Sequence, residues 1–289
     1  MSTRTQLLII DPQNDFCDLP EAYRPIGPLT HARQAPALPV AGAHADMQRL
    51  ASFVDRARSA LDQICITLDS HHRIDIAHPG FWRTGDGQPV NPFTSITAAQ
   101  VRAGAFSPRD PAALPRTLAY LDELDARGRY TLMVWPVHCE IGTWGHNVHA
   151  DLKAALSTWE DDNLTIVQTV NKGENPWTEH YSAMQAEVPD ADDPHTQLNE
   201  TLIRQLDQAE LLLIGGEASS HCVRATTEHI VAHLPSGNTH KVVLLTDAMS
   251  PVGGFEAQHA AFLADMQARG VRLMRCEEAL ALLGQTSDA

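Results

Sequence analysis

The sequence predicts an α/β fold, a three-layer sandwich with a mainly parallel sheet of about six strands and helices on both faces. Two observations lead to this prediction. Short aliphatic runs, each as long as a buried strand, alternate with longer segments whose apolar residues recur at helical spacing. The chain also contains no internal repeat, low-complexity tract or linker that would divide it. Such regular alternation is typical of a parallel sheet that helices cover on both sides.

Each expected strand is an aliphatic segment that ends in polar residues. In chain order the strands are expected at residues 6–11, 64–68, 130–135, 164–170, 211–214 and 241–247, with one further candidate at 271–276. Helical spacing predicts helices at 45–63, 112–127, 147–159, 198–208, 255–269 and 277–283. We expect these elements to form one domain over residues 1–289.

One connection is much longer than the others. Residues 70–112 are punctuated by Gly and Pro, and we expect them to form an elaborated loop around His78, Trp82 and Phe93. A connection of this length without secondary structure is usually functional. For His78 we expect a surface position, with a place in or beside a binding pocket as the alternative.

Composition limits the function classes. The chain has 289 residues, 43% of them hydrophobic, and a formal net charge of −15. This charge and the absence of any basic run argue against nucleic acid or an anionic membrane as a partner. No signal peptide or membrane-spanning segment is expected. The cysteines are odd in number and widely spaced, which argues for a reducing, cytoplasmic location and against a disulfide framework; they are Cys17, Cys65, Cys139, Cys222 and Cys276.

Reactive side chains follow several of the predicted strands. Ligands of parallel α/β sheets bind outside the carboxyl ends of the strands, so residues at these positions can share one site. Each residue alone has an ordinary structural explanation, such as closing a turn or lying in a solvated loop. Their common position at one sheet edge favours a functional site. The residues are Asp11, Asp69, His71, His138, Lys172 and Cys222.

Cys222 is the nucleophile candidate. It follows the strand at 211–214 and the pair Gly215-Gly216, and it falls in the first turn of the next helix. With Ser219 or Ser220 as the N-cap, the helix N-terminus would favour a thiolate over a thiol. The alternative is a small core residue that packs this helix against the sheet.

Asp11 and Lys172 supply what a cysteine nucleophile needs. A thiol with a pKa of about 8.5 is mostly protonated at neutral pH, so it requires a base, a nearby cation or both. Asp11 can accept the proton, and Lys172 can stabilise the resulting anion. Gly215 and Gly216 would let the backbone approach a ligand, and the N–H groups of Ala218 and Cys222 could form an oxyanion hole.

A second group of residues suits a metal ion. Asp69, His71 and His138 offer one carboxylate and two imidazoles, which are ligands for Zn²⁺, with Fe²⁺ or Mn²⁺ as alternatives. His138 lies far along the chain from the other two. The prediction therefore assumes that the strands at 64–68 and 130–135 are neighbours in the sheet.

These motifs together resemble the isochorismatase-like cysteine hydrolases, and within that family the nicotinamidases. The resemblance extends over residues 6–250 and implies a catalytic triad of Asp11, Lys172 and Cys222, a thioester intermediate, and the metal site just described. It also implies an aromatic pocket, for which we expect Phe16, Trp135, Tyr181 and His221. The motifs are Asp11-Pro-Gln13-Asn-Asp15-Phe16, Asp69-Ser-His71, Trp135-Pro-Val-His138-Cys139, Lys172-Gly173 with Tyr181-Ser182, and Gly216-Glu-Ala218-Ser-Ser-His-Cys222-Val223.

The sequence also departs from the pattern of nicotinamidases. Ser70 stands where these enzymes usually have Trp, and His221 stands where they usually have Tyr. The segment between His71 and His138 is longer than usual. These departures leave the reaction class unchanged and predict a partly rebuilt pocket wall.

The resulting expectation is a cytoplasmic amidase that converts a small, ring-bearing, nicotinamide-like amide to a carboxylate and ammonia. Isochorismatases proper lack the nucleophilic cysteine, so Cys222 favours an amidohydrolase. Two alternatives stay open: a metal-only hydrolase in which Cys222 is a core residue, and a non-catalytic small-molecule binding module. We expect a small-molecule amide as the substrate, no nucleic-acid or membrane partner, and a homo-oligomer.

Overall fold

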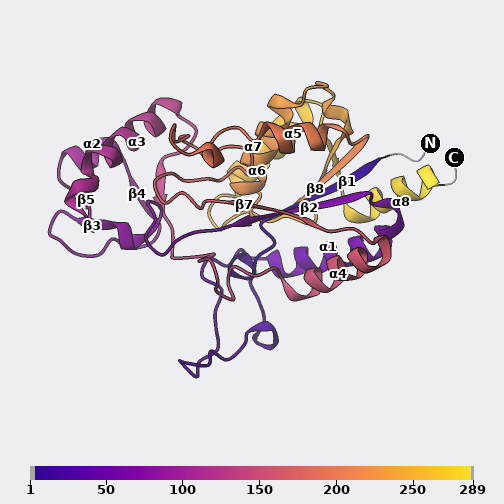
Figure 1. The fold of residues 1–289 in the computed structure, drawn as a ribbon, viewed down its shortest axis with the longest axis horizontal. Coiled ribbons are helices and arrows are strands. Elements are labelled where there is room, and N and C mark those ends of the chain that lie inside the picture. The colour runs from indigo at the N-terminus through magenta and orange to yellow at the C-terminus, as the bar shows by residue number, and fades with distance from the viewer. Residues whose placement is uncertain (1–3, 288–289) are drawn as a thin grey trace.

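A six-stranded parallel sheet forms the centre of the protein (Figure 1). The structure is a computed structural model that describes residues 4–287. The strand order is β10-β9-β8-β1-β2-β7, and every pairing in this sheet is parallel. The strands are β1 (Thr5–Ile10), β2 (Gln63–Asp69), β7 (Gln168–Lys172), β8 (Leu211–Gly216), β9 (Val242–Leu245) and β10 (Arg272–Met274). The predicted fold class is confirmed.

The two central strands carry the core. Every residue of β1 and β8 is buried, and Leu7 lies between Ile64 of β2 and Leu213 of β8 in the register of the sheet. A strand covered on both faces needs apolar side chains on both, so it appears in the sequence as a continuous aliphatic run. This is why the sequence located β1 and β8 well.

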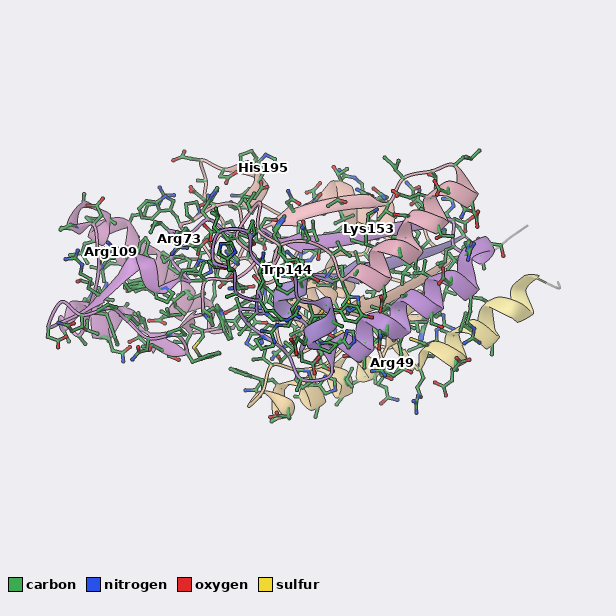
Figure 2. The ribbon with its side chains drawn as sticks, turned by 90° about the horizontal axis from the view of Figure 1, so that it is seen from below. Arg49, Arg73, Arg109, Trp144, Lys153 and His195 are labelled. Carbon is green, nitrogen blue, oxygen red and sulfur yellow. The ribbon has the colours of Figure 1, made fainter. Side chains whose placement is uncertain are left out.

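Helices form the two outer layers of the sandwich. On one face lie α1 (Ala43–Ala57), α4 (Ala150–Asn163) and α8 (Cys276–Ser287), and on the other lie α5 (Glu200–Asp207), α6 (Cys222–His233) and α7 (Glu256–Ala268) (Figure 1). Figure 2 views the molecule from below, with α1 and α4 side by side and with Arg49 and Lys153 marking the two helices. Among residues 4–287, no helix combines the length and the apolar character needed to cross a membrane.

The segment expected as one long loop is instead a small lobe, seen on the left of Figure 1. The prediction of a structureless connection over residues 70–112 is therefore wrong. Strands of three residues are too short to show a periodic pattern, which is why the sequence did not reveal them. The lobe contains β3 (Trp82–Thr84), β4 (Thr94–Ile96), α2 (Ala98–Arg102), β5 (Phe106–Pro108), α3 (Leu114–Arg127) and β6 (Leu132–Val134).

A second correction concerns the strand expected at 130–135. It is β6, and it pairs antiparallel with β4 in a separate two-stranded sheet, as β3 does with β5. The neighbour of β2 at the sheet edge is β7. Hydrophobic pattern identifies a strand but not its partner, so the assumed adjacency of the strands before Asp69 and His138 was wrong.

Short 3-10 helices occupy several connections. They lie at Asn14–Phe16, Glu21–Tyr23, Arg58–Ala60, Pro79–Phe81, Pro111–Ala113, Pro194–Thr196 and Thr239–Lys241.

Candidate active site

Four of the predicted site residues lie together at the carboxyl edge of the sheet. Asp11 directly follows β1, Asp69 ends β2, Lys172 ends β7, and Cys222 begins α6 after β8. The strands β8, β1, β2 and β7 are consecutive in the sheet, so these ends adjoin one another. All four side chains are buried.

Lys172 connects the group. Its Nζ lies 2.9 Å from Oδ2 of Asp11 and 2.9 Å from Oδ1 of Asp69, and it donates to Sγ of Cys222 at 3.5 Å. Burial alone would lower the pKa of Lys172, but the carboxylates of Asp11 and Asp69 outweigh it and raise this pKa well above its usual value. The ammonium is therefore a permanent cation beside the thiol, although it is only 2% exposed.

Asp11 is held in one orientation beside the thiol. Thr67 donates from its hydroxyl to Oδ1 of Asp11 at 2.6 Å, and the Asp11 backbone N–H donates to the Thr67 carbonyl at 3.1 Å. Burial raises the pKa of Asp11, and Lys172 opposes the rise without cancelling it. A carboxylate with a raised pKa is suited to accept a proton and then return it.

The thiol of Cys222 is protonated at rest. Burial raises its pKa well above the usual value, Lys172 opposes the rise, and a hydrogen bond with Asp11 adds to it. Desolvation at this depth thus opposes the thiolate that the helix N-terminus was expected to favour. Carboxylate oxygens of Asp11 and Asp69 and Sγ of Cys222 all lie within 4.8 Å of one another. Proton transfer from Cys222 to Asp11 thus needs no large movement.

The expected serine cap of α6 is also absent. The N-cap position is His221, and no side chain caps the helix there. The Ser219 hydroxyl instead pairs with Nδ1 of His259 at 2.8 Å. Ser220 pairs with Nδ1 of His221 at 2.9 Å and accepts from the Val252 N–H at 3.1 Å. Both hydroxyls fix neighbouring loops, and in the first turn of α6 the Val223 N–H donates to the Ala218 carbonyl at 3.2 Å.

The backbone before Cys222 can receive an oxyanion. Within residues 4–287, the N–H groups of Ala218 and Cys222 make no hydrogen bond. Such uncommitted donors at a helix start stabilise developing negative charge. Gly216 has a φ of +120°, and a Cβ there would lie 2.0 Å from the Ile10 carbonyl oxygen. Glycine is thus required here for strand packing, and its role in the approach of the backbone to a ligand stays a prediction.

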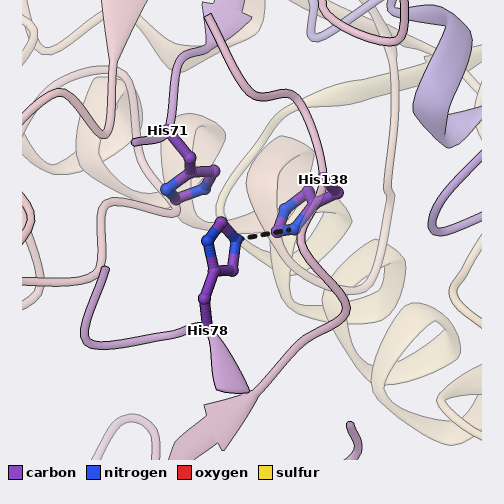
Figure 3. A group of neighbouring side chains, drawn as sticks. All are labelled: His71, His78 and His138. Carbon is purple, nitrogen blue, oxygen red and sulfur yellow. Dashed lines mark hydrogen bonds between the residues drawn. The ribbon is translucent and has the colours of Figure 1, made fainter. Parts of the chain in front are cut away.

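Three buried histidines form the second half of the site. Ring nitrogens of His71, His78 and His138 lie within 4.8 Å of one another, and Figure 3 shows the three rings around a common space. Oδ2 of Asp69 lies 3.1 Å from Nε2 of His71 and 3.3 Å from Nε2 of His138. His78 is 0% exposed, so the expectation of a surface position was wrong.

The partners of the three histidines assign their tautomers. Nδ1 of His71 lies 3.0 Å from the Asp75 carboxylate, Nδ1 of His78 lies 3.2 Å from the His72 carbonyl, and Nδ1 of His138 lies 2.8 Å from the Pro136 carbonyl. Nε2 of His78 in turn lies 3.3 Å from Nδ1 of His138 (Figure 3). With a metal ion bound, an Nδ1–H donated to an oxygen would leave Nε2 of each ring for the ion, which is how proteins orient histidine ligands.

The electrostatics of this cluster favour a cation. Burial and the neighbouring histidines lower the pKa of His78 to about 3, so its ring is neutral and can coordinate. Burial alone lowers the pKa of His71, but Asp69 and Asp75 outweigh it and raise this pKa well above its usual value. The carboxylates of Asp69 and Asp75 thus stabilise a positive charge at the His71 ring. A divalent ion bound there would replace a proton of that ring. Three imidazoles and one carboxylate fit Zn²⁺, Fe²⁺ or Mn²⁺.

A small cavity opens over Cys222. Its volume of about 20 Å³ is roughly that of one water molecule. The four residues predicted for the pocket, Phe16, Trp135, Tyr181 and His221, all line it. The lining residues that sequence reasoning missed are Leu38, Glu179 and Val252; no motif in the sequence singles them out.

The walls of this cavity are linked by polar and ring contacts. The Trp135 indole N–H donates to the Tyr181 hydroxyl at 3.1 Å, and the Trp135 and His221 rings meet edge to face at 5.3 Å. A ring-bearing substrate does not fit the cavity as it stands. Part of its lining must therefore move when such a molecule binds.

Comparison with known proteins supports the fold. No protein-family model matches the sequence, and no similar curated protein was found. The structure of the yeast nicotinamidase Pnc1p bound to the inhibitor nicotinaldehyde has a TM-score of 0.61 and 18% identity, covering 94% of this chain and 99% of that chain. A nicotinamidase/pyrazinamidase of Acinetobacter baumanii has a TM-score of 0.60 and 18% identity, with coverage of 96% and 98%.

A third solved structure contains a metal. The pyrazinamidase of Pyrococcus horikoshii in complex with zinc has a TM-score of 0.53 and 18% identity, and the match covers 94% of this chain and 99% of that chain. At a sequence identity of 18%, these similarities show a shared fold. The chain thus has, over nearly its whole length, the fold of the nicotinamidases and pyrazinamidases that its motifs resemble.

Proposed function

We propose that the protein is a cysteine amidohydrolase that converts a small ring-bearing amide to a carboxylate and ammonia. The observation that carries the proposal is Lys172, buried between Asp11 and Asp69 and in contact with Cys222. A buried cation that joins two carboxylates and a thiol is costly for a fold and serves no binding module. The nicotinamidases and pyrazinamidases of similar fold support the same reaction class.

Acylation uses the three side chains in turn. Asp11 takes the proton of the Cys222 thiol as Sγ bonds to the amide carbonyl carbon. The tetrahedral oxyanion is stabilised by the N–H groups of Ala218 and Cys222. The C–N bond then breaks, Asp11 returns its proton to the nitrogen, and ammonia leaves. A thioester on Cys222 is left behind, while Lys172 balances the negative charge throughout.

Deacylation repeats the sequence with water. Asp11 removes a proton from the water as its oxygen attacks the thioester carbonyl. The C–S bond breaks, the carboxylic acid product forms, and the proton held by Asp11 returns to the Cys222 sulfur. Each proton taken by Asp11 is thus returned within one turnover.

The second half of the site would hold one divalent metal ion. Asp69, His71, His78 and His138 are its proposed ligands, and Zn²⁺ is the proposed ion, with Fe²⁺ or Mn²⁺ as alternatives. When bound, the ion supplies a Lewis acid that fixes a ring nitrogen of the substrate or a water molecule. Phe16 and Trp135 would hold the substrate ring over Cys222.

We further propose that lobe and sheet act as one domain, because the cavity over Cys222 has walls from both, for example Trp135 and Phe16. The five cysteines are free, which supports action in the reducing cytoplasm. A homo-oligomeric assembly stays a prediction.

Ammonia release from a panel of ring amides, nicotinamide included, tests the proposed function. The cysteine mechanism predicts that alkylation by iodoacetamide stops turnover in proportion to Cys222 modification. Two results would contradict it. Activity that survives full alkylation but is lost in chelator would indicate a metal-only hydrolase. Binding without ammonia release from any amide would indicate a binding module.

A further inference from the structure

A second cavity adjoins the one over Cys222. Its volume is about 250 Å³, and Tyr181 and His221 line both cavities. These two rings, 5.3 Å apart between centroids, form the wall between them. We call the second space the arginine cavity. It is lined by Ser95, Arg129, Tyr130, Thr131, Met133, Tyr181, Ser220, His221, Arg224, Phe255 and Gln258.

The charge of the arginine cavity is positive. Arg129 and Arg224 are the charged residues of its lining, which contains no carboxylate. The nearest acid is Glu228, which accepts from Nε of Arg224 at 2.8 Å and from Nη2 of Arg129 at 3.0 Å. One carboxylate therefore serves two guanidinium groups.

A second acid does not cancel the remaining charge. Glu187 lies 3.8 Å from Arg129, but burial raises the pKa of Glu187 to about 7, so at neutral pH it is only partly ionised. Arg224 keeps both of its terminal Nη groups without a hydrogen-bond partner among the described residues. The cavity thus presents unused donors for an anion.

Aromatic rings complete the wall of the arginine cavity nearest Cys222. His221 lies 4.6 Å from Phe255 and is stacked on Tyr130 at 6.3 Å, centroid to centroid. The ring of a substrate can pack against such a wall while a charged substituent reaches the guanidinium groups. Volume points the same way, because about 20 Å³ over Cys222 cannot contain a ring, whereas the two cavities joined can.

We propose that the arginine cavity binds a carboxylate carried by the ring of the substrate, so that the preferred substrates are acidic ring amides. The proposal rests on the proposed amidohydrolase function and names its substrate class. The amide would lie over Cys222, and the ring would displace the wall formed by Tyr181 and His221. Arg224, with its uncommitted donors, would form the main contact to the carboxylate, and Arg129 would contribute charge.

A matched pair of substrates tests this directly. 3-Carbamoylbenzoate and benzamide share the ring and the amide and differ in one carboxylate. The intact protein should hydrolyse 3-carbamoylbenzoate with the higher kcat/KM. In Arg224→Gln the ratio of the two kcat/KM values should fall roughly 10- to 100-fold, the usual effect of losing a hydrogen bond to a charged group. Arg224→Lys should retain more of the ratio than Arg224→Gln, because it keeps the charge.

Arg204→Gln is the matched control. Arg204 forms an i,i+4 pair with Glu200 on α5, as Arg224 does with Glu228 on α6, and it does not line the arginine cavity. This variant should leave the ratio unchanged. A merely structural role of Arg224 would lower both kcat/KM values equally and would overturn the inference.

The remaining outcomes separate this inference from the proposed function. If no amide of the panel releases ammonia, the proposed function fails. If other ring amides are hydrolysed but 3-carbamoylbenzoate is not, only the substrate class is wrong. If both are hydrolysed and Arg224→Gln leaves their ratio unchanged, only the substrate class is wrong. Adding sodium benzoate to the benzamide assay tests whether the arginine cavity binds a separate anion instead of a carboxylate of the substrate. Activation of benzamide hydrolysis by benzoate, lost in Arg224→Gln, would indicate a separate effector and overturn the substrate assignment.

Discussion

The ammonium of Lys172 lies 2.9 Å from the carboxylate of Asp11, and both side chains are almost completely buried. A buried charge is tolerated only when an opposite charge and hydrogen bonds replace its water. Lys172 has two such carboxylates, and Asp11 has Lys172 and the Thr67 hydroxyl. A change of either residue removes a charge partner of the other, so each change should affect both stability and turnover.

Lys172→Met should therefore lower turnover about a thousandfold or more, as the loss of one member of a catalytic group commonly does. It should also cost about 3–5 kcal/mol of stability, because two carboxylates lose their cation. Asp11→Asn should give a similar loss of turnover. Since the residues act as a unit, the double variant should be little slower than either single one. Single-turnover rates of the folded variants measure this. A rate loss in the double variant equal to the product of the two single losses would contradict the shared role.

The histidine cluster gives a separate prediction. His78→Ala should reduce the equivalents of bound metal and lower turnover, because it removes one of the converging ring nitrogens. Elemental analysis of protein purified without chelator or affinity tag measures the metal directly. His72→Ala is the matched control, since that side chain is exposed and only its backbone carbonyl contacts His78. Full metal content in His78→Ala would remove this residue from the ligand set.

Asp75 should act on the metal through His71. Its carboxylate accepts from Nδ1 of His71 at 3.0 Å, and loss of such a partner typically weakens metal affinity about 10- to 100-fold. Competition with a chromophoric chelator should show this weakening in Asp75→Asn. Unchanged affinity would mean that Nδ1 of His71 needs no carboxylate to orient it.

The sequence predicted correctly the site residues that lie at or just after the end of a strand of the main sheet. Asp11 and Cys222 follow the buried strands β1 and β8, and Lys172 ends the edge strand β7. Because the carboxyl ends of parallel strands share an edge, their meeting could be expected. His138 was placed with Asp69 for a wrong reason. The strand before it belongs to the lobe, and a loop brings it to the site.

Other features depend on contacts that a single sequence does not contain. The three-residue strands of the lobe have no periodicity, so His78 was assigned to a surface loop. Burial raises the pKa of the Cys222 thiol, and only the packed structure reveals that burial. The arginine cavity likewise joins Arg129 and Arg224, which no local pattern connects.

Glu187 gives a pH prediction for stability. Burial raises its pKa from 4.5 to about 7. A raised carboxyl pKa means that the folded state retains a proton that the unfolded chain loses above pH 4.5. The contribution of Glu187 to the free energy of unfolding is thus fully present below pH 4.5 and is lost as the pH rises through about 7. In urea titrations, Glu187→Gln should be more stable relative to the parent at pH 8 than at pH 4.5, by about 3 kcal/mol at most.

The control for this prediction is Glu200→Gln, whose side chain is 66% exposed. It should change the stability difference between pH 4.5 and pH 8 very little. If Glu187→Gln behaves like this control, the carboxyl of Glu187 is not protonated in the folded protein, and Arg129 neutralises it instead.

Gly216 gives a purely structural prediction. A methyl group at this position would lie 2.0 Å from the Ile10 carbonyl oxygen, on a residue with a φ of +120°. Gly216→Ala should therefore destabilise the protein by more than about 3 kcal/mol, as backbone clashes and strained φ values do. Gly253→Ala has open space around its Cβ and should have a small effect. Equal urea midpoints for the two variants would contradict the packing of β8 on β1.

The most direct test of the central claim is mass spectrometry of the protein quenched in acid during turnover of an amide that it hydrolyses. We predict an acyl adduct, of the mass of the substrate minus ammonia, on the peptide that contains Cys222, and its absence in Cys222→Ala. An adduct on another residue, or near-normal ammonia release by Cys222→Ala, would contradict the account.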